Sequence, residues 1–486
     1  MLEQAVGWLN GILWSQPVIY FILGVGLLFS VLTRFLQVRH IKDMVMLMFQ
    51  GKSSKEGISS FQALSVALSG RVGTGNIAGT ATAIAMGGPG AVFWMWTIAF
   101  IGAGSAFVES TLGQIYKVNQ DGQYRGGPAY YIEKGIGWKW FAVAFAFSAI
   151  LSLSLLLPGI QSNSIASGME NAFGIDKAVT GAFLVVLIGI IIFGGVKRIA
   201  TVAQYVVPFM ALAYMFVALI IVVMNISELP AIFSLIIKSA FAVDSAFGGI
   251  VGMAVAWGVK RGVFSNEAGQ GTGPHAAAAA EVSHPAKQGL VQAASVYIDT
   301  LLVCSATAFM ILVTGMYNVK DAAGNFITEG LPGVDPGPGF TQAAIESVMP
   351  GFGASFVAIA LFFFAFTTIM AYYYMAETNI AYLVRGKNNF IPMTILKIVL
   401  LAATFYGAIR ATGLAWDLGD AGLGLMVWLN LVAILILAKP ALATLKDYEE
   451  QKKQGLDPVF DPEKLGIKNA DYWTNEYKQK NNDNAS

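Results

Sequence analysis

Two stretches of the sequence decide the fold. They read FQALSVALSGRVGTGNIAGTATAIAMGG at residues 61–88 and GGIVGMAVAWGVKRGVFSNEAGQGTGPHAAAAAE at residues 248–281. Both have apolar ends, yet each gathers glycine, polar and charged residues near its middle. Glycine in a helix interior costs about 1 kcal/mol relative to alanine. Each stretch is therefore predicted to be a helix that is broken near its middle.

Composition places these helices in a membrane. The 486-residue chain is 56% hydrophobic and 12% charged, whereas soluble domains carry about 25% charged residues. The apolar residues form long blocks such as FILGVGLLFSVLTRFLQV at 21–38, and a helix needs about 20 such residues to cross a bilayer. A charged residue at the bilayer centre costs at least ~2.5–3.5 kcal/mol. A broken, charged helix is tolerated there only where it is buried in protein or lines a cavity.

The net charge and the cysteine content argue against a nucleic-acid-binding protein and against a protein held together by disulfides or a cysteine-based metal site. The net charge is +1, and basic patches with interleaved aromatic residues are absent, so no nucleic-acid partner is predicted. Cys304 is the only cysteine, and the three histidines have no metal-binding spacing. The sequence therefore predicts neither a disulfide framework nor a cysteine-based metal site.

The apolar blocks predict an all-α polytopic membrane protein with about eleven transmembrane helices. The expected spans are 17–37, 61–86, 91–116, 138–160, 178–195, 202–224, 247–280, 288–316, 350–384, 390–410 and 421–441.

Loop charges predict the orientation of the chain. Basic residues such as Arg39, Lys42 and Lys55 follow the first span, whereas acidic residues dominate 317–349. The positive-inside rule then puts the N-terminus outside and the C-terminus in the cytoplasm. The expected location is the plasma membrane, specifically the inner membrane of a bacterium. The expected divisions are an extracellular N-terminus, an extra helix and a basic cytoplasmic loop at 1–60, five-helix repeats at 61–226 and 227–444, and a polar cytoplasmic tail at 445–486.

The two broken helices resemble each other. Arg71 precedes Asn76 by five residues and NIAG follows, while Arg261 precedes Asn266 by five residues and NEAG follows. Because the copies lie five spans apart, they run in opposite directions, as in an inverted five-plus-five repeat. Close helix packing is an alternative reason for the glycines, but packing alone does not require these arginine and asparagine residues.

Four blocks carry a resemblance to a known family. GGPGAVFWMW at 87–96 resembles the signature of the alanine or glycine:cation symporter family, and GRVGTGNIAG, GGPAYYIEKG and RGVFSNEAGQGTGPHAAAAAE resemble further blocks of it. The resemblance implies a leucine-transporter-type fold and no enzymatic activity. It also implies import of alanine, glycine or D-alanine by symport with sodium or protons, with no cofactor besides the coupling ion.

A substrate site is expected where the helices break. The half-helix that starts near Asn76 offers unpaired N–H groups and a positive dipole end to a carboxylate. The ammonium group is expected to face the carbonyl end of the second broken helix, near 256–258. The candidate substrate-binding residues are Gly73, Thr74, Gly75, Asn76, Trp257, Phe264, Ser265, Asn266 and Gln270.

A cation site is expected beside the first break. Sodium prefers oxygen ligands, which carbonyls from Ser69 to Val72 and the Asn76 side chain offer. By resemblance to the fold, the hydroxyl groups of Thr367 and Thr368 are expected to bind the sodium ion. The alternative for both threonines is a hydrogen bond to their own helix. Arg71 and Arg261 are expected to form salt bridges, for which Glu109, Glu267 and Glu377 are the candidate partners or, alternatively, proton relays.

Two other functions are weighed against symport. An ion or solute channel also uses broken helices, but a filter-like motif is absent from the sequence. An intramembrane enzyme would need a catalytic motif such as a paired-histidine metal site, and none is evident. The residues do not choose among the three small substrates or between the two ions, and they predict no oligomeric state.

Overall fold

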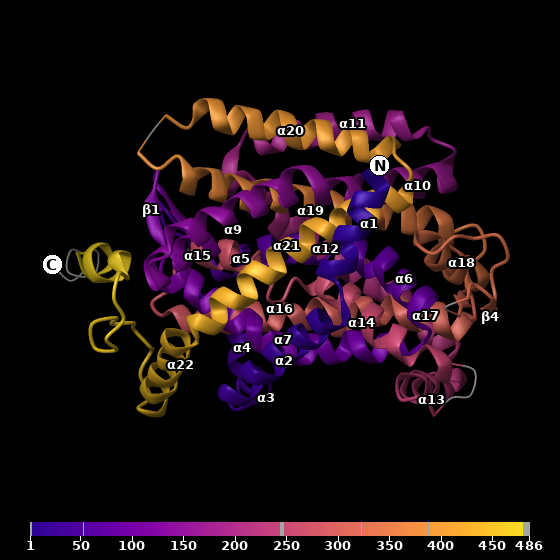
Figure 1. The fold of residues 1–486 in the computed structure, drawn as a ribbon, viewed down its shortest axis with the longest axis horizontal. Coiled ribbons are helices and arrows are strands. Elements are labelled where there is room, and N and C mark those ends of the chain that lie inside the picture. The colour runs from indigo at the N-terminus through magenta and orange to yellow at the C-terminus, as the bar shows by residue number, and fades with distance from the viewer. Residues whose placement is uncertain (1, 52, 244–246, 322, 387, 480–486) are drawn as a thin grey trace.

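The structure, a computed structural model, describes residues 2–479 except 52, 244–246, 322 and 387. Helices dominate it, as Figure 1 shows, and confirm the predicted all-α class. The strands of the described part form two short antiparallel hairpins, β1 (Val118–Gln120) with β2 (Gln123–Arg125) and β3 (Asn318–Lys320) with β4 (Phe326–Glu329). The last seven residues of the predicted tail, 480–486, lie outside the described residues.

Within the described residues, seven helical segments are long and apolar enough to cross a membrane. They are α7 (Gly90–Ile115), α9 to α10 (Lys139–Phe173), α12 (Gly195–Met224), α16 to α17 (Pro285–Thr314), α19 (Gly353–Leu383), α20 (Phe390–Ile409) and α21 (Thr412–Ile436). A pair bent by 44°, α1 (Leu2–Leu13) with α2 (Gln16–Leu32), the shorter apolar helix α11 (Lys177–Ile192) and the two broken helices complete the predicted set of about eleven.

The first broken helix is interrupted where the sequence predicts. Helix α5 (Ser60–Arg71) starts with a capping box, in which Ser59 Oγ accepts from the Gln62 N–H at 3.2 Å. After 72–74 the chain continues as a π-helical turn, η1 (Gly75–Gly79), and then as α6 (Thr80–Gly87).

The second broken helix is interrupted later than predicted. Helix α14 (Val251–Asn266) is continuous through the glycines at 258 and 262 and ends where Glu267 adopts a left-handed φ of 55°. Gly269 and Gly271 have φ values of 80° and 85°, which residues with a side chain rarely adopt. The break therefore spans 267–272, before α15 (Gly273–Ala279).

The broken helices run in opposite directions, because the first half of one packs against the second half of the other: α5 lies against α15, and α6 against α14. Ile58, just before α5, donates to the Ala279 carbonyl oxygen at 2.9 Å, and Glu281 donates to the Ile58 carbonyl oxygen at 2.9 Å. The N-terminal end of one broken helix therefore lies beside the C-terminal end of the other, which is the arrangement that an inverted repeat requires.

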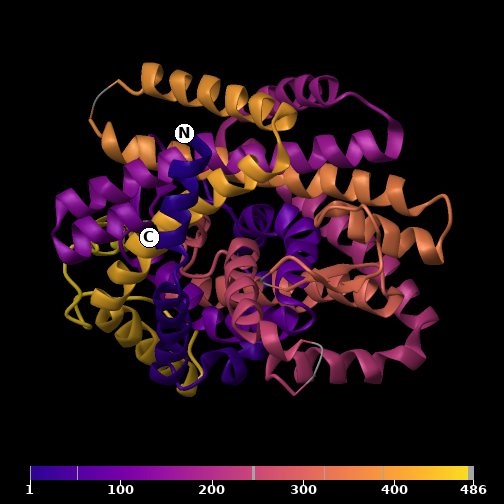
Figure 2. The same ribbon diagram turned by 45° about the vertical axis from the view of Figure 1, so that its right-hand side comes forward.

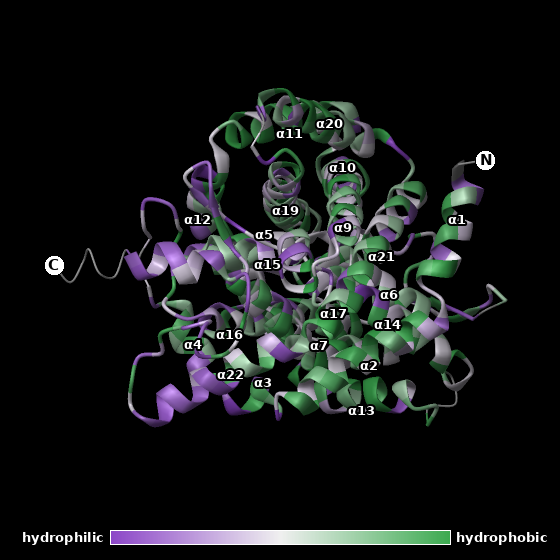
Figure 3. Ribbon diagram, turned by 60° about the vertical axis from the view of Figure 1, so that its left-hand side comes forward, coloured by the Kyte–Doolittle hydropathy of each residue, from purple (hydrophilic) through white to green (hydrophobic). Residues whose placement is uncertain are grey.

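The remaining helices surround this pair. Helix α7 packs against α14, α15 and α16, while α11 and α20 lie side by side along the opposite edge (Figure 1). The N-terminal helix α1 lies along α21, and Figure 2 shows the same pairing from a second direction. Hydrophobic residues cover most of the helical body, whereas α22 (Ala438–Lys453) and the chain after it are mainly hydrophilic (Figure 3).

Several short helices were not predicted. They are α1 in the expected N-terminal extension, α3 (Leu36–Arg39), α4 (Ile41–Met48), α8 (Pro128–Tyr131), η2 (Ile132–Ile136), η4 (Ile226–Glu228), α13 (Leu229–Ala240), α18 (Pro338–Val348), α22 and η7 (Tyr472–Tyr477). Apart from α22, each has twelve residues or fewer, which is too short to cross a bilayer.

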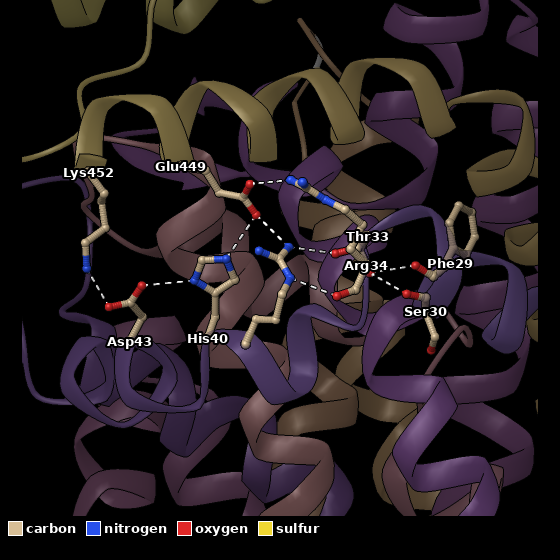
Figure 4. A network of polar contacts seen from close by, with 9 residues as sticks. Phe29, Ser30, Thr33, Arg34, His40, Asp43, Glu449 and Lys452 are labelled. Carbon is tan, nitrogen blue, oxygen red and sulfur yellow. Dashed lines mark hydrogen bonds and ion pairs between the residues drawn. The ribbon is translucent and has the colours of Figure 1, made fainter. Parts of the chain in front are cut away.

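The polar tail, whose structure the sequence did not predict, is docked on the helical body. Glu449 of α22 accepts from Arg34 and Arg39 at 2.7 Å each, and its Oε1 lies 3.0 Å from His40 Nε2 (Figure 4). Farther along, Trp473 is fully buried and its indole N–H donates to the Gln114 carbonyl oxygen at 2.9 Å. The tail therefore contacts the body at two separate places.

Candidate functional site

The two breaks meet inside the protein. A Cβ atom added at Gly75 would lie 3.0 Å from Phe264 Cδ1 and 3.1 Å from Ser265 Cα. Glycine at position 75 therefore lets the first broken helix approach the last turn of α14 directly. Gly75, Phe264 and Ser265 are three of the predicted substrate-site residues, and the structure brings them together.

A buried carboxylate joins the breaks. Asn76 accepts from the Gly73 N–H at 2.8 Å and donates to Asp299 Oδ1 at 2.6 Å. Ser265 Oγ donates to the same oxygen at 3.1 Å, and Thr300 Oγ1 donates to Asp299 Oδ2 at 2.7 Å. All of these side chains are buried.

Asp299 is satisfied by hydrogen bonds alone. Among the described residues, no lysine or arginine forms an ion pair with it. A buried carboxylate without a cationic partner is costly, so its place beside the break suits a bound cation or a proton. Sequence reasoning missed Asp299. The available signal was an acid inside the apolar span at 288–316, because such residues are rare and functional.

Amide and hydroxyl groups near the breaks have unused bonding capacity. The Gln161 side-chain oxygen accepts from the Thr74 N–H at 3.1 Å. The Thr74 hydroxyl, the Asn266 side-chain nitrogen and both amide atoms of Gln270 are buried without hydrogen-bond partners. Buried polar groups are normally paired, so these atoms are candidates for contacts with a polar ligand.

Two expectations about the second broken helix need correction. Because α14 continues to Asn266, residues 256–258 lie inside the helix and are not its carbonyl end. Trp257 contacts Lys260 and Arg261, whose cationic groups lie 5.0 and 5.1 Å from its ring centre. These contacts place Trp257 beside the two cations, one helical turn or more before the break.

The predicted cation residues divide into two groups. Thr368 Oγ1 donates to the Ser69 carbonyl oxygen at 2.8 Å, and a Cβ atom at Gly73 would collide with the same hydroxyl. Ser69 and Thr368 therefore lie together at the first break. Both threonine hydroxyls also bond within their own helix: Thr367 donates to the Phe363 and Phe364 carbonyl oxygens at 3.0 and 2.9 Å, and Thr368 to the Phe364 carbonyl oxygen at 3.0 Å. The contact with Ser69 is what distinguishes Thr368 from Thr367.

Comparison with known proteins decides the family. Residues 1–462 match the model of the sodium:alanine symporter family. The chain belongs to this family. It is 72% identical to the putative sodium/proton-dependent alanine carrier protein YrbD of Bacillus subtilis (strain 168), over 98% of both chains. It is 59% identical to the sodium/proton-dependent alanine carrier protein of Bacillus sp. (strain PS3), over 90% of this chain and 98% of the relative.

More distant proteins agree. The sodium/alanine symporter AgcS of Methanococcus maripaludis is 35% identical over 92% of this chain and 97% of its own. A crystal structure of the Eremococcus coleocola manganese transporter, 14% identical, matches with a TM-score of 0.51 over 84% of each chain. That likeness shows the leucine-transporter-type fold alone. As a member of the sodium:alanine symporter family, the protein is a multi-pass secondary transporter, and the channel and enzyme alternatives are wrong.

The two arginines of this symporter have partners that the sequence did not suggest. Arg261 forms a double ion-pair contact with Asp420 of α21, at 2.9 and 2.8 Å, and Lys260 binds Asp420 at 2.6 Å. Arg71 donates to Ser295 and to the Gln292 carbonyl oxygen of α16. Neither arginine forms an ion pair with the three predicted glutamates among the described residues.

Those glutamates have other partners. Glu109 accepts from the Gly269 and Gly271 N–H groups at 3.3 and 3.1 Å, so it holds the second break in shape. Glu267 accepts from the Thr272 hydroxyl at 2.8 Å. Glu377 pairs with Arg125 at 3.0 Å.

A layer of rings covers one side of the breaks. The Phe264 and Trp416 rings lie 5.2 Å apart, and the Arg261 guanidinium lies 4.5 Å from the Trp416 ring centre. Because Arg261 is also bound to Asp420, this layer links α14 to α21.

A cavity of about 650 Å³ lies at the end of the protein where α19 and α21 begin. The polar side chains that line it come from α10, α11, α18, the start of α21 and the loop before α18, and they include Asn163, Lys177, Asp335, Gln342, Glu346 and Thr412. At the opposite end of α19, the Ala381 carbonyl oxygen accepts a hydrogen bond from the Gln120 side chain. Gln120 belongs to the β1–β2 hairpin, in which the Tyr124 N–H donates to the Glu56 carbonyl oxygen, close in sequence to Ile58. The cavity and the Ile58–Ala280 bridge therefore lie at opposite ends of the molecule.

Proposed function

We propose that the protein imports a small neutral amino acid, alanine foremost, together with sodium ions or protons, through a site between its two broken helices. The single observation that carries this proposal is the buried cluster of Asn76, Ser265 and Asp299 at the point where the breaks meet. The names of the bacterial relatives, sodium/proton-dependent alanine carriers, support the substrate and the coupling ions.

The substrate carboxylate would bind the first break. N–H groups at the start of a half-helix attract anions, and glycines at 73 and 75 permit close approach. The Thr74 N–H is bound to the Gln161 amide oxygen, which an incoming carboxylate would displace. The freed Gln161 oxygen, Gln270 and carbonyl oxygens in the last turn of α14 then offer acceptors to the ammonium group.

The coupling cation has two candidate sets of oxygen ligands. One consists of the Asn76, Ser265 and Asp299 side chains, where a carboxylate is able to bind either sodium or a proton. The other consists of the Ser69 and Val72 carbonyl oxygens and the Thr368 hydroxyl. The second set contains Thr368 rather than Thr367 because, although both hydroxyls bond to their own helix, it is the Thr368 hydroxyl that also reaches the Ser69 carbonyl oxygen.

Tight packing around the breaks would explain a small substrate. Phe264 packs against both Gly75 and Trp416, so a side chain much larger than a methyl group would collide with these rings. Alanine, glycine and D-alanine fit this restriction. The 650 Å³ cavity would be the entrance from outside, with the C-terminus in the cytoplasm of a bacterial cell, in accord with the loop charges.

The test is uptake of labelled alanine and glycine into proteoliposomes, with sodium and proton gradients imposed separately. Wild-type protein is expected to accumulate alanine against its gradient only when one of the two gradients is present. If neither gradient drives uptake of either amino acid, the proposal fails.

Matched variants test the site. Asp299→Asn is expected to abolish the response to the driving ion, whereas Asp321→Asn, in a loop outside the membrane spans, leaves it unchanged. Thr368→Val is expected to raise the sodium concentration needed for half-maximal uptake. Thr367→Val is the neighbouring control, and a larger effect there than at Thr368 would contradict the second ligand set.

A further inference from the structure

A second cavity lies far from the substrate site, where the tail meets the end of the last transmembrane helix. Its volume is about 520 Å³. It is lined by the end of α7, by η2 and the residues after it, by the junction of α21 and α22, and by the tail segment 465–469. The cavity is therefore built jointly by the membrane body and the tail.

The charged side chains that line this cavity are all basic. They are Lys134, Lys439 and Lys468, and no acidic residue of the described part lines it. Lys134 is paired with Asp471 at 2.5 Å. Lys439 and Lys468 are exposed, and neither forms an ion pair within the part of the chain that the structure describes. Two uncompensated positive charges therefore face one space.

The other lining residues are largely apolar. Ile136, Trp138, Ile436, Leu437 and Leu465 form much of the wall. Because Ile436 ends α21, the cavity lies at the depth where the membrane spans stop.

Two tryptophans support this depth. Trp138 and Trp140 stack with ring centres 6.1 Å apart and are 47% and 70% exposed. Exposed tryptophans of this kind are characteristic of the membrane–water interface. The cavity thus combines an apolar wall that reaches toward the acyl chains with a basic rim at headgroup level.

We propose that this cavity binds an anionic phospholipid, with its phosphate between Lys439 and Lys468 and one acyl chain along Trp138 and Ile436. Lysine binds phosphate as a point charge, and basic pockets at helix ends are suited to anionic headgroups. Free phosphate would leave the apolar wall unused, which is why a lipid suits the site better.

The bound lipid would join the tail to the membrane body. Lys439 follows the last span, whereas Lys468 belongs to the tail. The adjacent Asn469 donates to the Lys134 carbonyl oxygen at 2.8 Å, so the tail is already in place beside the cavity. Anionic lipid is therefore expected to protect tail residues 465–469 from exchange with solvent.

The experiment uses full-length protein in nanodiscs of phosphatidylcholine alone or with added phosphatidylglycerol. Phosphatidylglycerol retained by the protein is measured by native mass spectrometry, and hydrogen exchange is measured at 465–469. The variant Lys439→Gln/Lys468→Gln is expected to weaken phosphatidylglycerol binding roughly 30-fold. Each lysine near an anionic surface strengthens binding on the order of fivefold, and the variant removes two of them. The control Lys446→Gln/Lys453→Gln removes the same charge from α22 outside the cavity.

Each outcome is decisive. The proposal holds if phosphatidylglycerol is retained and protects 465–469 in wild type and control but not in the cavity variant. It is overturned if both lipid mixtures behave alike, or if the control loses as much binding as the cavity variant. Protection by inorganic phosphate in detergent equal to that by lipid would identify a free-anion site and overturn it as well. Trp138→Ala, with Trp8→Ala as control, tests the acyl-chain wall without changing charge, and unaltered lipid retention would contradict that wall.

Discussion

Replacing Trp473 by alanine is expected to release the C-terminal tail without unfolding the transporter. Trp473 is fully buried and packs edge-on against Phe460, with ring centres 5.2 Å apart. Its ring centre lies 5.2 Å from the Lys117 ammonium group, and its indole N–H binds the Gln114 carbonyl oxygen at 2.9 Å. Lys117 in turn donates to the Ala280 carbonyl oxygen at 3.0 Å, next to the bridge between the broken helices.

The magnitude follows from these contacts. Truncating a buried tryptophan to alanine costs about 3–5 kcal/mol. The nearby polar contacts of the tail, such as Asn469 with Lys134 and Tyr472 with Tyr124, contribute about 0.5–1.5 kcal/mol each. Trp473 therefore outweighs any one of them. At about 1.4 kcal/mol per tenfold change, the population of the undocked tail should rise by roughly two to three and a half orders of magnitude.

Hydrogen exchange measures this directly. Amides at 470–477 are expected to exchange faster by that factor in Trp473→Ala, and those of Ile58 and Glu281 should also lose protection because the support of Lys117 is weakened. Trp8, which is 71% exposed, is the matched control, and Trp8→Ala should leave all these amides unchanged. Unchanged exchange at 470–477 in Trp473→Ala would show that Trp473 does not anchor the tail and would refute this reasoning.

Three further predictions concern the site, the ring layer and pH. Gly75→Ala should reduce alanine uptake at least tenfold, because its Cβ would lie 3.0 Å from Phe264 Cδ1; uptake equal to that of Gly79→Ala, whose Cβ would lie 3.9 Å from Arg261 Cδ, would contradict this. Arg261→Lys should lower the free energy of unfolding by about 1.5–3 kcal/mol in thermal unfolding, because it removes one of the two charge-assisted hydrogen bonds to Asp420 while Lys260 still pairs with that carboxylate; Arg198→Lys, on the surface, is the control. Burial lowers the pKa of His284 below its ordinary 6.5, although Asp447 opposes the shift. The contribution of His284 to stability is therefore complete above pH 6.5 and is lost as the pH falls below it. Tail proteolysis should increase in that window for wild type and should not respond to pH in His284→Gln.

The broken helices show how much of the backbone structure the local sequence predicts. Glycine and charged residues in an apolar stretch are costly in any membrane helix, so both interruptions could be predicted, and the first was placed correctly. The second was misplaced because Gly258 and Gly262 serve packing: Cβ atoms there would collide with Ala91 and Trp94 or with Ile98 of α7. Sequence shows a glycine, but only the neighbouring helix shows whether it breaks or packs.

Polar contacts between distant segments are what the local sequence does not predict. Asp420 binds Arg261 across a separation of 159 residues, and Trp473 binds Gln114 across 359. The side-chain type predicts that a buried arginine needs an acidic partner, but the sequence alone offers several acidic residues that meet this requirement equally well. The choice depends on which helices the fold brings within a few ångströms.

By itself the sequence determined the membrane class, the approximate spans and the two interruptions, because apolar length and backbone-breaking residues act locally. The family was indicated separately, by the resemblance of four sequence blocks. Tertiary structure alone decided that Asp299 completes the cluster between the breaks and that Thr368 rather than Thr367 faces Ser69. It also decided that the polar tail docks on the helical body, with Trp473 as one of its buried contacts. These features depend on distances between segments far apart in the chain, which local propensity does not encode.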